Sequence, residues 1–161
     1  MNLIHNNIST IIMNIFRGYN HKKYWRRMAI VIDPGRKSYL LVKLYYLLYI
    51  KRADAKNNCS FGTNLNSGSK FQTPPILPHG PNGIILGHNL VFGNNVITHH
   101  QLTIAHGGGK IGNDVLFGAG SKVLSVINIG SGSKIGMNAV VIKNISANST
   151  VVLNKSRIVL K

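Results

Sequence analysis

Large aliphatic or aromatic side chains recur at every sixth residue over about a third of this chain. Ten such hexads share one register, with a single inserted residue after the fourth. A six-residue period matches neither the 3.6-residue period of an α-helix nor the two-residue alternation of an ordinary sheet. It is typical of a parallel β-helix, in which each hexad forms a short strand and a turn. The repeated positions are Leu86, Phe92, Thr98, Ile104, Ile111, Phe117, Val123, Ile129, Ile135 and Val141.

The residues between these positions support the same interpretation. Aliphatic or small side chains occupy the place four residues later in most hexads, and glycine or asparagine occupies the turns, where a positive φ is tolerated. A β-sandwich would instead need period-two alternation and longer strands. Because one coil cannot bury its inward face alone, we expect stability to come from the stacking of successive coils.

The first 56 residues have a different pattern, which predicts helices over 8–16, 24–32 and 37–52. The sequence Asp33-Pro34-Gly35 breaks the second from the third. Two interpretations of the leucine-rich third helix stay open. It packs on a neighbouring domain or subunit, or its basic, aromatic-edged face rests on an anionic membrane surface. We therefore expect a basic helical segment over 1–56, a β-helix over 57–152 and a tail over 153–161.

The charge composition restricts the chemistry. The chain has 19 Lys and Arg against 3 Asp and no Glu, for a net charge of +16, and 11 of the 19 basic residues lie within 1–56. So few carboxylates argue against a paired-carboxylate hydrolase and against a Ca²⁺ or Mg²⁺ site, which leaves general base catalysis to the 7 histidines. The lone Cys59 excludes an internal disulfide framework. No nucleic-acid-binding motif accompanies the positive charge, so we expect no nucleic-acid partner.

Two further expectations concern location. No stretch reaches the roughly 18 apolar residues of a membrane span. The N-terminus lacks the charged-then-apolar order of a signal peptide. These features predict a cytoplasmic protein, with peripheral contact at the inner face of the membrane as the variant that the basic segment allows.

Four segments resemble the hexapeptide-repeat acyltransferases, within them the serine acetyltransferase branch with its polysaccharide O-acetyltransferases. The segments are LPHGPNGIILG (77–87), FGNNVITHHQLTI (92–104), KIGNDVLFGAGSKVL (110–124) and INIGSGSKIGMNAVVIKNI (127–145). The resemblance implies a left-handed parallel β-helix and an acetyl-CoA-dependent O-acetyltransferase. It also implies a homotrimer with active sites between subunits.

The resemblance also implies which residues act in catalysis. The catalytic histidine of the branch falls on His79, and the aspartate that orients it is replaced by Asn64. His106, beside the glycines that interrupt the repeat, matches the base of the sugar and xenobiotic branch and is the second candidate. The general base would take the proton of the acceptor hydroxyl, because the thioester is reactive enough to need no covalent intermediate.

Departures from the branch bear on the acceptor. Pro78 stands where serine acetyltransferases have an aspartate that contacts serine, and the later Arg-His pair is replaced by Gly107–Gly109. We therefore expect a sugar hydroxyl of a cell-surface polysaccharide, carried by a glycan or by a nucleotide- or lipid-linked sugar. Serine O-acetylation in cysteine biosynthesis is the alternative, and a non-catalytic β-helix scaffold is the second alternative. His99 and His100 either line the acceptor pocket with Pro78 or are surface residues.

The donor site is likewise implied by the resemblance. Acetyl-CoA would lie in a groove between two subunits, against Ala105, Gly107, Ala119 and Met137. Lys122 and Lys143 are candidates for its phosphates or are solvated surface residues, and the C-terminal turn of the branch is degraded at 153–157. We expect no metal, because the histidine spacing and the missing acidic partners differ from the hexapeptide carbonic anhydrases.

Overall fold

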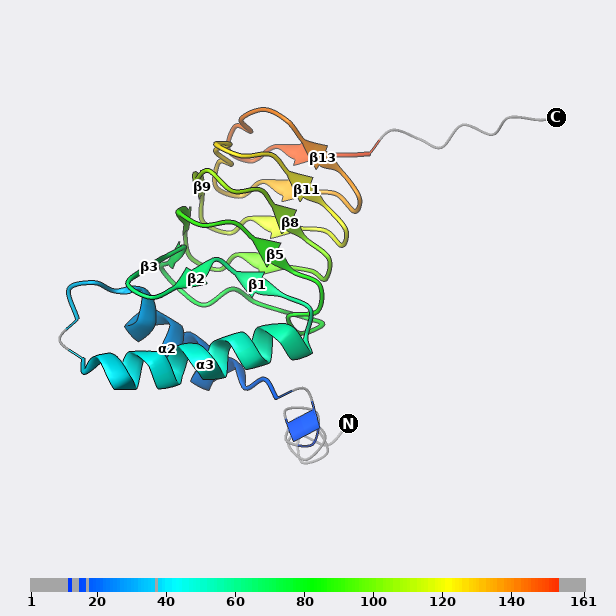
Figure 1. Cartoon of the computed structure of the whole chain (residues 1–161). Helices are drawn as coiled ribbons and strands as arrows, with labels where there is room; N and C mark the ends of the chain where they lie inside the picture. Colours follow the sequence, from blue (N-terminus) through cyan, green and yellow to red (C-terminus); the bar gives the residue numbers. More distant parts are fainter. Residues whose placement is uncertain (1–11, 13–14, 17, 37, 154–161) are drawn as a thin grey trace.

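A computed structural model describes residues 12, 15–16, 18–36 and 38–153. Two helices lie at the N-terminal end of a solenoid of short parallel strands, which rises away from them (Figure 1). The expected mostly β architecture, a parallel β-helix preceded by helices, is confirmed. Most of the predicted helix over 8–16, and the turn at 154–157, lie outside the described residues.

The solenoid has three faces, each a ladder of parallel strands. The first face consists of β1 (Ser60–Phe61), β5 (Ile85–Leu86), β8 (Thr103–Ile104), β11 (Lys122–Val123) and β13 (Val140–Val141). The second face consists of β4 (Lys70–Phe71), β6 (Leu90–Phe92) and β9 (Gly109–Ile111), continued by bridges from Ile111 to Ile129 and from Ile129 to Ile145. The third face consists of β7 (Ile97–Thr98), β10 (Leu116–Phe117), β12 (Lys134–Ile135) and β14 (Thr150–Val151), and Ile76 is bridged to Ile97.

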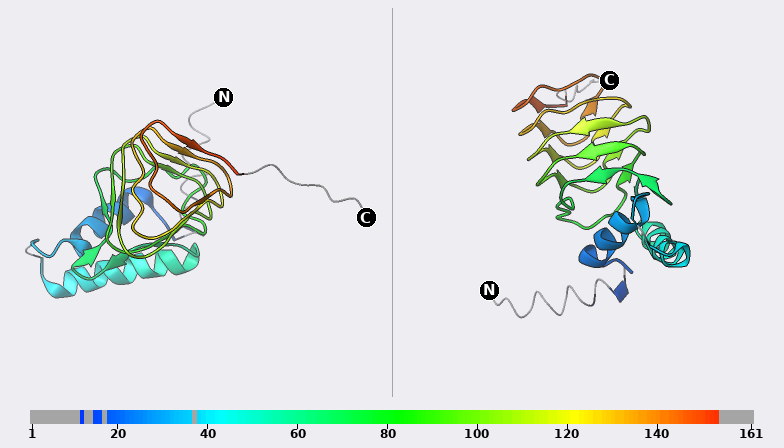
Figure 2. Two further views of the ribbon diagram at one scale, coloured as in Figure 1. Left: turned by 90° about the horizontal axis from the view of Figure 1, so that it is seen from above. Right: turned by 90° about the vertical axis from the view of Figure 1, so that its left-hand side faces the viewer.

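The three faces meet at three corners, which Figure 2 shows from above. The first corner, between the first and second faces, comprises 62–69, 87–89, 105–108, 124–128 and 142–144. The second corner comprises 72–75, 93–96, 112–115, 130–133 and 146–149. The third corner, which returns the chain to the first face, comprises 77–84, 99–102, 118–121 and 136–139.

The side chains of the hexad repeat form the core, as predicted. On the first face Leu86, Ile104, Val123 and Val141 stack in strict register, one on each coil. The other repeated positions are equally enclosed: Phe92, Phe117 and Ile135 have no exposed surface. The second set of positions, four residues further on, is also buried: Leu90, Val96, Leu102, Val115, Ser121, Ile127, Ser133 and Ala139. Burial at both sets explains why the six-residue period is so regular.

The first corner departs from the coil pattern at the helical end. There β2 (Thr63–Asn64) and β3 (Ser67–Gly68) form a short antiparallel hairpin. The backbone N–H of Asn66 donates to the carbonyl of Val31 at 2.8 Å, so the hairpin is tied to the preceding helix.

Helix α2 (His21–Ile32) closes the open end of the core with an aromatic cluster. Its first turn is capped by Asn20, whose side-chain oxygen accepts from the backbone N–H of Lys23 at 2.9 Å. Trp25 packs edge-on against Phe61 and Phe71, with ring centroids 5.0 and 4.7 Å apart. Without such a cap, the first coil would expose one end of the solenoid core to water.

Helix α3 (Leu40–Lys56) begins and ends later than the leucine pattern predicts. It turns Lys43, Ile50, Ala53 and Asp54 inward, whereas Leu41, which the pattern would place among the packing residues, is 78% exposed. Lys43 is accommodated because its Nζ donates to the carbonyl of Asp33 and to Oδ1 of Asn66, both at 2.7 Å. The pattern could not show this because α3 is apolar on both sides.

A buried carboxylate links the two helices to the first coil. The Tyr24 hydroxyl donates to Oδ1 of Asp54 at 2.7 Å, and the Cys59 thiol lies 3.7 Å from the same atom. Oδ2 of Asp54 has no hydrogen-bond partner among the described residues. Burial raises the pKa of Asp54 to about 6, despite the opposing effects of the Tyr24 hydrogen bond and of Lys51.

This pKa shift predicts how stability depends on pH. Because the folded protein holds the Asp54 proton more tightly than the unfolded chain, its contribution is complete below about pH 4 and is lost as the pH rises through about 6. Two pKa units correspond to about 3 kcal/mol. The variant Asp54→Asn keeps an acceptor for Tyr24 but cannot ionise. We expect urea unfolding between pH 4.5 and 7.5 to show a flatter pH profile for this variant. An unchanged slope would contradict the assignment.

Close stacking of the coils predicts a second stability effect. A Cβ on Gly112 would lie 2.5 Å from both the backbone nitrogen and Oγ of Ser131 on the next coil. We expect Gly112→Ala to destabilise the protein by about 1–3 kcal/mol in thermal or urea unfolding. Gly35→Ala, in the loop between the helices, is the matched control, because the nearest atom to its Cβ is a side-chain oxygen of Asp33 at 3.4 Å. Equal effects of the two substitutions would argue against tight coil spacing.

Candidate active site

Three histidines gather at the third corner. The ring of His79 lies 5.5 Å, centroid to centroid, from the rings of both His99 and His100. His79 is exposed, and the other two are half-buried. They line one side of a hollow of about 390 Å³, whose other side is formed by Gly118, Ala119, Gly136 and Met137 together with Leu116 and Ile135. Four of the residues expected from the sequence thus lie near His79. His99 and His100 are in ring contact with it, and Ala119 and Met137 line the same hollow.

The loop 77–84 places His79 above the strands. Its backbone is held by a hydrogen bond from the N–H of Gly80 to the carbonyl of Leu77 at 3.1 Å. Gly80 itself has φ of 73°, a conformation in which a side chain would be strained. The carbonyl of Asn82 accepts from the N–H of Gln101 on the next coil at 3.1 Å. The histidine is therefore carried by a loop anchored at both levels of the solenoid.

His79 lines two hollows. The second, of about 480 Å³ and mostly polar, is also lined by Pro78, Gly80, Asn82 and His100, and His100 is shared with the first. A base in this position is open to a group in either hollow. The arrangement suits removal of a proton from a hydroxyl in one hollow while that hydroxyl attacks a group held in the other.

Another group of the expected site residues lies at the first corner, across the first face. Asn64 is exposed in the β2–β3 hairpin, and Ala105, His106 and Gly107 follow β8. Lys143 follows β13 at the same corner. His106 stacks on His88 of the preceding coil, with ring centroids 5.2 Å apart and a 3.3 Å contact from the His88 N–H to Nδ1 of His106. Within one chain, neither Asn64 nor His106 is brought to His79.

Lys122 lies between the two groups, at the start of β11 on the first face. Its Nζ donates to the carbonyl of Gln101 at 3.0 Å and to Oγ1 of Thr103 at 3.2 Å. The ammonium is thus held next to the third corner and remains exposed to solvent.

Sequence reasoning did not single out Gly80, Asn82, Gly118 or Gly136, although all four line the two hollows. The coil length was the available signal. Successive positions of one corner are 18 to 19 residues apart in the strand register, as Leu86, Ile104 and Val123 show. Adding that length repeatedly to position 79 reaches the turns near 99, 118 and 136.

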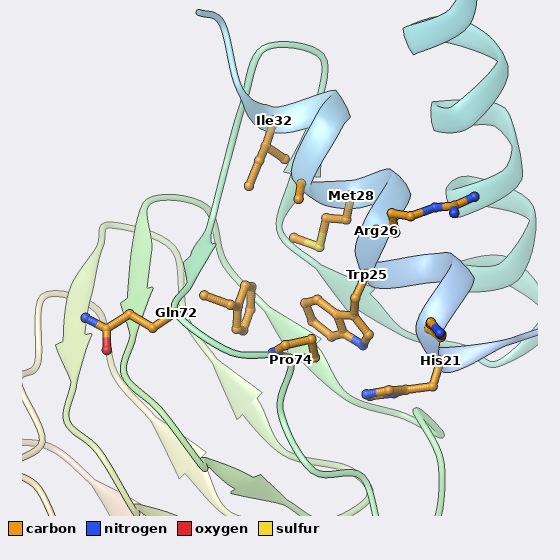
Figure 3. A pocket seen from close by; sticks show the side chains of 10 residues that line it. His21, Trp25, Arg26, Met28, Ile32, Gln72 and Pro74 are labelled. Carbon is orange, nitrogen blue, oxygen red and sulfur yellow. The ribbon is translucent and has the colours of Figure 1, made fainter. Parts of the chain in front are cut away.

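A larger groove, of about 550 Å³, lies away from the histidine cluster, between α2 and the segment 71–74 (Figure 3). Trp25, Met28, Ile32, Phe71 and Pro74 make it mostly apolar. His21 lines its rim, with the Tyr19 hydroxyl 3.0 Å from its Nδ1, and burial lowers the pKa of His21. The described residues contain no cluster of three or more histidine, cysteine or acidic side chains suited to a metal ion.

Comparisons with known proteins agree with this geometry. No family model matches the chain. Among curated proteins, the serine acetyltransferase of Helicobacter pylori (strain ATCC 700392 / 26695) is 31% identical over 147 residues, which cover 83% of this chain and 85% of that protein. The chain belongs to the serine acetyltransferase family. The mitochondrial serine acetyltransferase 3 of Arabidopsis thaliana is 36% identical over 106 residues, or 62% of this chain and 27% of that protein.

Solved structures of the family share the fold. The serine acetyltransferase of Neisseria gonorrhoeae is 26% identical with a TM-score of 0.65, over 88% of this chain and 55% of that one. Isoform 3 of Entamoeba histolytica, solved with cysteine, is 20% identical with a TM-score of 0.63, over 87% of this chain and 60% of that one. This chain therefore spans little more than half the length of these two structures. The expected left-handed β-helix acyltransferase fold is confirmed.

Family membership confirms one expectation about activity and overturns another. The family is one of O-acetyltransferases that use acetyl-CoA, as expected, and a Brucella abortus member was solved with coenzyme A. The expectation of a sugar hydroxyl in a surface polysaccharide is wrong, because the curated relatives are serine acetyltransferases. That expectation gave too much weight to Pro78 and Gly107–Gly109, which are loop and turn residues, whereas the family is defined by the coils.

The described helices do not meet the requirements for crossing a membrane. Among the residues that the structure describes, no helix combines the length and the apolar character needed to cross a bilayer.

Proposed function

We propose that this protein transfers the acetyl group of acetyl-CoA to the side-chain hydroxyl of L-serine, with His79 as the general base. The observation that carries the proposal is the 31% identity to the Helicobacter pylori serine acetyltransferase over most of both chains. The presence of His79 in the lining of both hollows supports it independently, because the reaction needs a base that is within reach of a donor and an acceptor.

The reaction assigns the following steps to the side chains. The His79 imidazole takes the proton from the serine hydroxyl as the oxygen attacks the thioester carbon. The carbon–oxygen bond forms, and a tetrahedral oxyanion results. When it collapses, the carbon–sulfur bond breaks, and the imidazolium returns its proton to the thiolate of CoA. His79 thus ends the cycle neutral, and no covalent enzyme intermediate is required.

Serine would enter the polar hollow beside Pro78 and Asn82. Its carboxylate needs a cation, and the family's Arg-His pair is missing here. His100 lines both hollows, and Lys122 holds its ammonium beside the same corner. We assign carboxylate binding to this side of the site, with His99 supporting the ring of His79.

The pantetheine arm would follow the mostly apolar hollow along Ala119 and Met137. The other donor-site candidates, Ala105, Gly107 and Lys143, lie at the first corner, as does Asn64. One protomer thus carries two half-sites on different corners. A cyclic homotrimer in which the third corner of one protomer faces the first corner of the next would join them. Asn64 or His106 of the neighbouring subunit would then be able to reach the base.

The role of His79 is tested by thiol release from acetyl-CoA with L-serine as acceptor. We expect His79→Asn to lower kcat by at least about 100-fold, the usual effect of losing a general base, with little change in unfolding temperature. The matched control is His21→Asn, a histidine at the rim of the α2 groove, which we expect to keep near wild-type activity. Wild-type protein without serine-dependent release, or an active His79→Asn variant, would refute the proposal.

The trimer arrangement is tested by mixing two inactive variants. His79→Asn disables the third-corner half-site, and Ala105→Leu obstructs the first-corner half-site. When subunits are exchanged at equal amounts, about a quarter of the interfaces would combine two intact halves, so we expect roughly a quarter of wild-type activity to return. Activity that stays at the level of the separate variants would show that each site is built from one chain.

A further inference from the structure

Helix α3 carries a row of exposed apolar side chains on its outer side. Leu41, Leu44, Tyr45 and Leu48 are 78%, 42%, 62% and 69% exposed, and they fall on one stripe at helical spacing. Tyr39 and Leu40 extend the row at its N-terminal end, where they are 86% and 59% exposed. We call these six residues the outer stripe. Figure 1 shows α3 lying across the helical end of the molecule, outside the coils.

The inner side of α3 fixes the direction in which the outer stripe points. Lys43 makes its two 2.7 Å hydrogen bonds on that side, and Asp54 accepts from Tyr24. The buried guanidinium of Arg27 lies over the rings of Tyr46 and Tyr49, 4.9 and 4.3 Å from their centroids, and 5.4 Å from that of Tyr45, which therefore marks the edge of the outer stripe. A rotation that buried the leucines would break all of these contacts. The exposure of the outer stripe is therefore built into the fold.

Positive charge borders the outer stripe. Arg52 follows Leu48 by one turn on the same side of α3, and the exposed Lys56 flanks it, whereas the Lys51 ammonium donates to the carbonyl of Thr63 on the coil side at 2.7 Å. Arg36 is exposed just before the helix begins. Only two acidic residues lie within 1–56, and one of them, Asp54, is buried. A partner that covers the stripe must therefore tolerate or complement a basic border.

We propose that the outer stripe of α3 docks on the surface of an anionic lipid bilayer. The helix would lie flat, with its leucines at the level of the upper acyl chains, its tyrosines among the headgroups and its basic residues against lipid phosphates. Its 17 residues extend for about 25 Å, which suits a helix lying in the interface. A second copy of this chain fits less well, because it would bring an equal positive border against the first.

The test is co-sedimentation of the full chain with lipid vesicles. We expect binding to phosphatidylcholine vesicles that contain about 30% phosphatidylglycerol, little binding to pure phosphatidylcholine, and loss of binding at high salt. The double variant L41N/L48N should reduce partitioning at least about tenfold, and Arg52→Gln should reduce it a few-fold.

Two control variants separate this surface from general properties of the protein. Ile142→Asn removes an equally exposed apolar side chain near the far end of the solenoid, and Lys134→Gln removes an exposed charge on the third face. Both should bind vesicles as the wild type does. All variants should keep serine-dependent thiol release, which shows that they are folded.

Three results would overturn the proposal. The first is a wild type that fails to sediment with the anionic vesicles, and the second is an L41N/L48N variant that sediments as well as the wild type. The third is a smaller assembly of L41N/L48N than of the wild type in sedimentation velocity without lipid. The stripe would then be a contact between copies of the chain.

Discussion

The stacking of inward side chains from one coil to the next is the interaction on which the rest of the structure depends. Leu86, Ile104, Val123 and Val141 lie in register on one face, and no single coil could bury its own member of that row. The same stacking fixes the corners, because the strands on either side of each turn are hydrogen-bonded to those above and below. A residue in one turn thus acquires neighbours 18 to 21 residues away. His79, His99 and His100 meet for this reason alone, although they belong to two different coils.

The three-faced solenoid also separates residues that lie close together in sequence. Asn64 and His79 belong to the same coil but to different corners, and Ala105 and Ala119 are separated in the same way. The interior of the solenoid is filled with side chains, so substrates can bind only on its outside. A two-substrate reaction therefore needs a second wall, and the distribution of the expected donor-site residues over two corners is consistent with a neighbouring protomer supplying it.

Most of the fold could be predicted from the sequence, because the six-residue period arises from the side chains that are buried in each coil. The same period, counted in coils, would have assigned Gly118 and Gly136 to the corner of His79. Two features could not be predicted from the six-residue period. The orientation of α3 was not predictable, since leucines and tyrosines surround the helix. Polar contacts such as those of Lys43 with Asn66 and Asp33 decide which side is buried. The acceptor was predicted wrongly. A single loop residue such as Pro78 shows that the aspartate of the family is missing, but it does not show which other group binds the acceptor.

The helical end shows how polar groups can fix a packing that hydrophobicity leaves open. On α3 the buried side carries Lys43 and Asp54, each held by a hydrogen bond, while Leu41 and Leu48 face outward. Burying a cation and a carboxyl group carries a desolvation cost, whereas burying two leucines would be favourable, so this arrangement is not the one that would best stabilise an isolated chain in water. A surface that receives the leucines offsets that cost. Ile50 and Ala53 complete the buried side of α3 within the chain, whereas the exposed leucines are the apolar surface that the proposed docking on lipid would cover.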